Sequence, residues 1–182
     1  MDNTITTDII TTEVTTGNTS TNTLTTTSTT INNVFNIANG FSKFNDLWSP
    51  KIAGEINNMH IKLAKLHGVF VWHKHEDEDE LFLVIKGILT MKTRELIVPL
   101  PIEDEETVTG GDEEPNLDSN PKFIERIQII NIGEFLIIPK GVEHCPVANE
   151  ECEVILLEPK STVNTGNISN DSKTVKVLDS LI

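Results

Sequence analysis

The stretch that decides the fold is GVFVWHKHEDEDELFLVIKG, residues 68–87. Two short runs rich in β-branched and aromatic residues flank an acidic tetrapeptide at 76–79. Such runs are typical of β-strands, and a polar cluster between them indicates a turn. Residues 68–87 therefore predict two consecutive strands joined by a tight acidic turn.

Runs of the same kind continue on both sides of this stretch, between about residues 31 and 160. They are MHIKLAKLHG, ILTMKT, RIQIINIG, EFLIIPKG and CEVILLEP. Their short, regular spacing favours an antiparallel sandwich or barrel over alternating strands and helices, so we expect an all-β fold. One helical turn is predicted at 42–47, with Ser42 as its N-cap.

Two histidines lie in the first predicted strand of this stretch, at His73 and His75. Residues i and i+2 of a strand point to the same face, so their imidazoles should converge. Glu80 opens the next strand, and the turn between the strands brings its side chain to the same side. Taken singly, two histidines on a strand are more often ordinary half-buried residues, and Glu80 is one more solvated acid in an acidic run.

A third imidazole follows a sharp turn in GEFLIIPKGVEH, residues 133–144. Pro139 fixes φ and Gly141 accepts a positive φ, so the next strand, which begins near His144, is aimed back across the sheet. Three neutral imidazole nitrogens and one carboxylate suit a divalent transition ion such as Fe, Mn, Ni or Zn, and not Ca. On its own, His144 is also consistent with a residue that merely packs beside a turn.

The charge of the chain limits its partners. Among 182 residues there are 14 basic and 28 acidic side chains, a net charge of −14. Binding to nucleic acid or to an anionic membrane surface needs a basic patch, so neither partner is expected. The sequence has no run of 18 apolar residues and no signal-peptide pattern, so we expect a cytoplasmic protein. Its two cysteines, Cys145 and Cys152, are too few for a disulfide framework.

Three segments are expected to flank or interrupt the barrel. Half of residues 1–30 are threonine, which predicts a disordered arm and leaves open a phosphorylation substrate. An acidic insertion at about 101–122 is interpreted as a solvated loop, with a docking surface for a basic partner or a Ca²⁺ site as alternatives. The barrel then spans 31–165, and 166–182 forms a C-terminal tail.

The two histidine-containing stretches together resemble the paired motifs of the cupin superfamily. The first motif corresponds to Gly68, His73, His75, Glu80 and Gly87, with one residue fewer after the first glycine. The second corresponds to Gly133, Pro139, Gly141 and His144; the asparagine that ends it in the family is displaced, because Ala148 holds its place and Asn149 follows. More narrowly, WSPKIAGE, IPKGVEHCPVA and EPKSTVNTGN are similar to small single-domain cupins often labelled mannose-6-phosphate isomerase-like.

The resemblance implies a cupin-type double-stranded β-helix, or jelly-roll barrel, whose metal is held by His73, His75, Glu80 and His144. Three functions follow from it: a metalloenzyme that isomerises or oxygenates a small polar molecule, a metal-supported module that binds a small ligand without turnover, or a barrel whose metal site is vestigial. No separate general base is evident, because His60 is expected at the surface.

The strand ELFLVIK also predicts how the protein assembles. Its inward face carries Glu80, while Leu81, Leu83 and Ile85 point the other way. A strand that is apolar on both faces is covered on both faces, so we expect a homodimer, as in many single-domain cupins. The alternative is that residues 34–38 of the same chain supply the cover.

Overall fold

The computed structural model describes residues 34–97 and 122–182. The chain divides into Met1–Val34 and Phe35–Ile182, and the described helix and strands all belong to the second unit. The predicted arm at 1–30 and nearly all of the predicted acidic loop lie outside the described residues.

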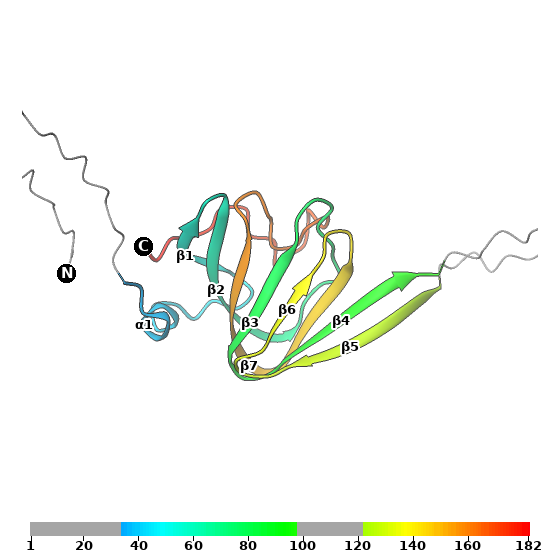
Figure 1. Cartoon of the computed structure of the whole chain (residues 1–182), viewed down its shortest axis with the longest axis horizontal. Helices are drawn as coiled ribbons and strands as arrows, with labels where there is room; N and C mark the ends of the chain where they lie inside the picture. Colours follow the sequence, from blue (N-terminus) through cyan, green and yellow to red (C-terminus); the bar gives the residue numbers. More distant parts are fainter. Residues whose placement is uncertain (1–33, 98–121) are drawn as a thin grey trace, which may run out of the picture. The chain divides into compact units, whose positions relative to one another are not determined.

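Seven antiparallel strands build this unit, which confirms the all-β prediction (Figure 1). They are β1 (Lys51–Ile56), β2 (Met59–Val69), β3 (Glu80–Lys86), β4 (Leu89–Leu96), β5 (Phe123–Ile130), β6 (Phe135–Ile138) and β7 (Glu143–Pro159). The order across the main sheet is β1-β2-β7-β3-β6, and β4 pairs with both β5 and β7. The long strand β7 thus links two sets of strands: its first residues pair with β4, and its later residues lie between β2 and β3.

The only helix among the described residues is α1 (Ile37–Phe41), so the predicted helical turn at 42–47 is wrong. Asn36 caps it, because its Oδ1 accepts a hydrogen bond from the Asn39 N–H at 2.9 Å. Ser42 lies at the opposite end, where its N–H donates to the Ala38 carbonyl. Both residues are good N-caps, and the burial of Phe41 against the sheet favours the earlier one.

The segment that carries His73 and His75 is not a regular strand, contrary to prediction. Strand β2 ends at Val69, and residues 70–79 make only one isolated bridge, between His73 and His144. The ladder would continue at Pro146, which has no N–H to donate, so the pairing with β7 is interrupted there. The segment is therefore positioned by a few specific contacts.

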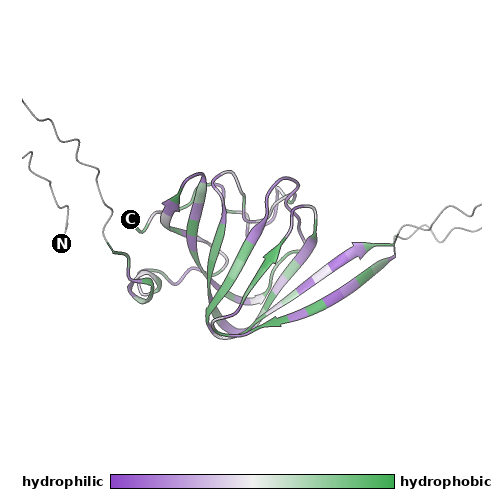
Figure 2. Ribbon diagram, viewed as in Figure 1, coloured by the Kyte–Doolittle hydropathy of each residue, from purple (hydrophilic) through white to green (hydrophobic). Residues whose placement is uncertain are grey.

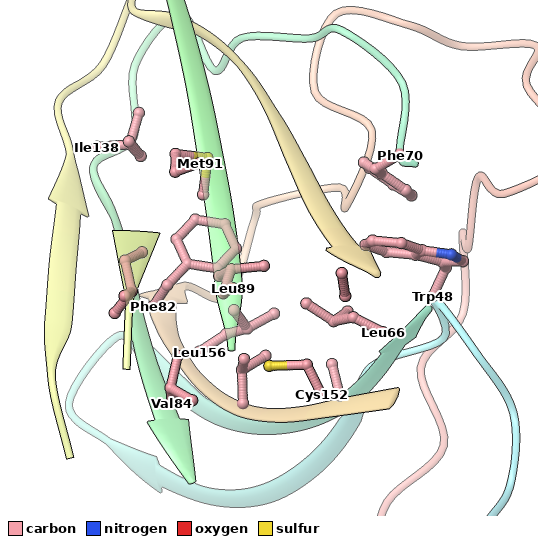
Figure 3. Packing of buried hydrophobic residues seen from close by; sticks show 14 residues of the cluster. Trp48, Leu66, Phe70, Phe82, Val84, Leu89, Met91, Ile138, Cys152 and Leu156 are labelled. Atoms are coloured by element: carbon pink, nitrogen blue, oxygen red, sulfur yellow. The ribbon is translucent and has the colours of Figure 1, made fainter. Parts of the chain in front are cut away.

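The interior is filled from several strands by large apolar side chains, among them Trp48, Phe70, Phe82, Leu89 and Met91 (Figure 3). In β3 the inward residues Glu80, Phe82 and Val84 are buried, and the residues between them are half-buried. Figure 2 shows that β3 and β6 are hydrophobic over most of their length. Strand β3 is therefore apolar on its outer face as well as inside.

Candidate metal centre

The structure brings all four predicted site residues together in the interior. The ligand atoms of His73, His75, Glu80 and His144 lie within 4.8 Å of one another, and all four residues are buried. His73 and His75 come from the segment after β2, Glu80 is the first residue of β3, and His144 is the second residue of β7. Residues far apart in the sequence thus form one compact cluster.

Backbone contacts set the positions of the histidines. The His73 N–H donates to the His144 carbonyl at 3.0 Å, and the His144 N–H donates to the His73 carbonyl at 2.8 Å. The His75 carbonyl accepts from the Gly141 N–H at 2.6 Å. Gly141 has φ +79°, so the positive φ predicted for this turn is confirmed.

The tautomers of two imidazoles follow from their hydrogen bonds. His73 Nδ1 lies 3.0 Å from the Val71 carbonyl, and His144 Nδ1 lies 3.0 Å from the Val142 carbonyl. A carbonyl can only accept, so each Nδ1 carries a proton, and in the neutral ring the lone pair is then on Nε2. Both rings are thereby prepared to donate a lone pair from Nε2.

Three polar atoms at the centre have no hydrogen-bond partner among the described residues. These are His75 Nε2, His144 Nε2 and Glu80 Oε2. Glu80 Oε2 lies 3.3 Å from His75 Nε2 and 3.4 Å from His144 Nε2. Buried polar groups without partners are costly, and these three atoms are close enough to bind one cation together.

Burial and neighbouring charge shift the pKa values of two of the four groups, His73 and Glu80. Burial, with repulsion from His144, lowers the pKa of His73 to about 4, so its imidazole is neutral at pH 7. Burial alone would raise the pKa of Glu80, but the imidazoles of His144 and His75 hold that pKa below its ordinary value. Three imidazoles and one carboxylate are a ligand set that fits a divalent transition ion.

A cavity of about 30 Å³ adjoins His73 and Glu80. Its other walls are almost entirely apolar, and they include Trp48, which stacks on Phe70 with ring centroids 4.7 Å apart. The remaining polar group, Asn164, is committed elsewhere: its Nδ2 donates to two carbonyls and its Oδ1 accepts from the Val175 N–H. The cavity has room for about two water molecules.

Sequence reasoning missed a buried ion pair between Lys62 and Glu158. Lys62 Nζ lies 2.6 Å from Glu158 Oε1, and the two side chains are 1% and 0% exposed. The alternation of β2 turns Lys62 inward, together with Ala64. Burial and the charge of Glu80 raise the pKa of Glu158, while Lys62 opposes that shift.

His60, expected at the surface, is also buried on this face, with its Nε2 3.2 Å from Glu55 Oε1.

Lys74 pairs with Glu76 at 2.8 Å. Cys145 is buried, and its thiol donates to the Phe70 carbonyl. Burial raises the pKa of Cys145, so its thiol is protonated at neutral pH.

Comparison with known proteins shows the family. No family model matches the chain. A cupin-2 domain containing protein from Shewanella frigidimarina is 35% identical, with a TM-score of 0.51, over 70% of this chain and 95% of that one. The cluster and the fold define a cupin barrel, and the chain belongs to the cupin superfamily, which confirms the resemblance predicted from the two motifs.

Two other relatives are more distant. Hydroquinone 1,2-dioxygenase from Sphingomonas sp. TTNP3, solved with 4-hydroxybenzoate bound, is 13% identical over 71% of this chain and 32% of that one, with a TM-score of 0.50, and shares the fold. The uncharacterized protein YdbB of Bacillus subtilis is 29% identical over 90 residues, 50% of this chain. The chain matches 54% of the length of that curated relative.

No helix within residues 34–97 and 122–182 is long and apolar enough to cross a membrane.

Proposed function

We propose that the chain binds one divalent transition ion, Fe, Mn, Ni or Zn, through His73, His75, Glu80 and His144. With that ion, it acts as a small metalloenzyme on a small polar molecule, by metal-assisted isomerisation or oxygenation. The observation that carries the proposal is the set of three buried, unpartnered atoms on His75, His144 and Glu80. A bound cation would satisfy all three at once.

The residues of the chain have separate tasks in this proposal. His73 and His144 offer Nε2 lone pairs fixed by their Nδ1 hydrogen bonds, and Glu80 supplies the negative charge. Trp48 and Phe70 belong to the apolar walls of the cavity that adjoins His73 and Glu80. When bound, the ion supplies Lewis-acid or redox chemistry to a ligand oxygen.

A ligand-binding module without turnover is the second candidate. Apart from His73 and Glu80, no ionisable side chain in the described part of the chain lines the cavity. Proton transfer would therefore lack a group separate from the metal ligands. This favours a metal that anchors a ligand and does not turn it over.

One screen separates the two candidates. The purified chain is loaded with each of the four metals and tested for oxygen consumption and for isomerisation of small carbonyl compounds. Turnover that Glu80→Gln abolishes supports the metalloenzyme. Saturable ligand binding without turnover supports the module, and failure of the chain to take up any of the four metals would refute both.

We also propose that the protein is a homodimer that pairs through the outer face of its main sheet. A groove of about 490 Å³ on this face is lined by apolar side chains, including Ile61, Leu81, Leu83, Ile155 and Leu157. The chain covers part of the face itself: Phe41 and Phe44 pack on Leu63, and Ile85 packs against this cluster.

The covering is incomplete on the side of β6. The register pairs Leu83 with Phe135 and Leu81 with Ile137, so these side chains share the outer face. Phe135 is 62% exposed and Ile137 is 49% exposed. Burying such side chains stabilises by roughly 1.5–3 kcal/mol each, which supports a second copy as the cover.

A cytoplasmic location is also proposed. Both cysteines of the chain, Cys145 and Cys152, are buried free thiols. Free thiols are the usual state in a reducing compartment.

A further inference from the structure

The segment between β2 and β3 carries two of the four proposed ligands but has few backbone partners. His73 pairs with His144, and the His75 carbonyl accepts from Gly141. Both of these contacts come from the second histidine-containing motif. The Phe70 N–H also donates to the Pro146 carbonyl at 3.0 Å. A further attachment comes from residues 160–182, which follow β7 and lie outside both motifs.

Asn167 holds the peptide between the two histidines from both sides. The Lys74 N–H donates to Asn167 Oδ1 at 3.0 Å. In return, the Asn167 N–H donates to the Lys74 carbonyl at 3.0 Å. Two hydrogen bonds of good length fix both the position and the orientation of this residue.

Gly166 allows the approach that makes this pair of bonds possible. It has φ +49°, and a Cβ built on it would overlap the Lys74 carbonyl oxygen and lie 3.3 Å from His75 Cε1. The backbone therefore runs closer to the Lys74 carbonyl than any residue with a side chain permits.

The segment that carries Asn167 is itself firmly held. The Thr165 side chain is fully buried, and its hydroxyl donates to the Ile168 carbonyl at 2.7 Å. Further along, Asp179 pairs with Lys51 at 2.7 Å, and its carbonyl accepts from the Ile52 N–H at 2.9 Å. The segment is thus ordered around Asn167 by its own hydrogen bond and attached to β1 through Asp179.

We infer that Asn167 and Gly166 are positioning residues for the metal centre. They hold the Lys74 peptide so that the imidazoles of His73 and His75 meet at one point. This inference rests on the proposed metal binding. Groups that orient ligands in this way typically change metal affinity by about 10–100-fold when they are lost.

The test compares Asn167→Ala with Asn167→Asp in the full chain, with Co²⁺ as the probe. Asn167→Ala removes the oxygen that accepts from Lys74, whereas Asn167→Asp retains one. We expect Asn167→Ala to bind Co²⁺ about 10–100-fold more weakly, with an altered visible absorption spectrum, and Asn167→Asp to restore most of both. Gly166→Ala should resemble Asn167→Ala. Asn170→Ala, at an exposed position three residues away, is the matched control and should match the wild type.

Thermal melting of the metal-free variants separates positioning from general stability. Unchanged Co²⁺ affinity and spectrum in Asn167→Ala would overturn the inference while the proposed metal binding stands. The inference would also be overturned if the loss of Co²⁺ affinity in Asn167→Ala follows a fall in melting temperature and Asn167→Asp does not restore it. Absence of Co²⁺ binding by the wild type would instead overturn the proposed function, and this inference with it.

Discussion

Replacing Lys62 with methionine should destabilise the protein strongly, because it leaves the carboxylate of Glu158 buried without its partner. The two side chains are 1% and 0% exposed and lie 2.6 Å apart, and Glu158 Oε2 has no hydrogen-bond partner among the described residues. Breaking a buried ion pair by removing one partner costs about 3–5 kcal/mol. Domains of this kind have a total free energy of unfolding of roughly 5–15 kcal/mol.

Urea unfolding followed by tryptophan fluorescence measures this loss. With a slope of about 1–3 kcal/mol per molar, the midpoint should fall by roughly 2 M. The double variant Lys62→Met/Glu158→Met removes both charges and should be more stable than Lys62→Met alone. Lys86→Met is the matched control, since Lys86 is 60% exposed and lies 3.7 Å from Glu151, and it should cost only about 0–1 kcal/mol.

The pH dependence of the Lys62→Met loss is a further check. Burial and the charge of Glu80 raise the folded-state pKa of Glu158 above its unfolded value. At pH 5 the Glu158 carboxyl of the folded protein is protonated and neutral, so it needs no partner. The fall in the free energy of unfolding caused by Lys62→Met should therefore be smaller at pH 5 than at pH 8. A loss below about 1 kcal/mol at pH 8, equal to that of Lys86→Met, would refute the reasoning.

Four other predictions follow from the described residues and the sequence. Because burial lowers the pKa of His73 to about 4 while the unfolded imidazole titrates near its ordinary value of 6.5, the unfolded state binds more protons between these values. The metal-free protein should therefore lose up to about 3 kcal/mol as pH falls from 6.5 to 4, and an unchanged urea midpoint over that range would contradict this. Leu83→Lys should convert the proposed dimer to monomer, and sedimentation equilibrium showing a wild-type mass near 20 kDa throughout would exclude the dimer. Gly87→Ala should destabilise more than Gly68→Ala, since both have φ +81° but only at Gly87 would a Cβ meet a carbonyl oxygen at 2.7 Å; equal losses in thermal melting would show that φ alone matters. Deleting residues 1–30 should leave melting temperature and metal content unchanged, because their composition offers few apolar groups to pack; a clear fall would show that they stabilise the barrel.

The site could be predicted from the sequence because its residues come in two short, closely spaced motifs. The i, i+2 spacing of His73 and His75 placed their imidazoles together even though no regular strand forms there. The expected strand was interrupted at Pro146, an effect that depends on which residue lies opposite in β7. The helix was misplaced because Asn36 and Ser42 are both suitable caps, and tertiary packing decides between them.

The features that were missed depend on contacts between distant residues. Lys62 and Glu158 are 96 residues apart, and only the register of β2 with β7 shows that both point inward. Asn167 and Lys74 are 93 residues apart, and nothing in the composition of either segment indicates their contact. His60 was expected at the surface, whereas the structure buries it beside Glu55.

Elemental analysis of the purified protein tests the central claim most directly. The wild type and the double variant His73→Ala/His75→Ala are prepared identically, and their Fe, Mn, Ni and Zn contents are measured per chain. We predict close to one divalent ion per wild-type chain and little or none in the variant. Equal metal content in the two proteins, or a wild type that takes up none of the four metals when they are supplied, would contradict the account.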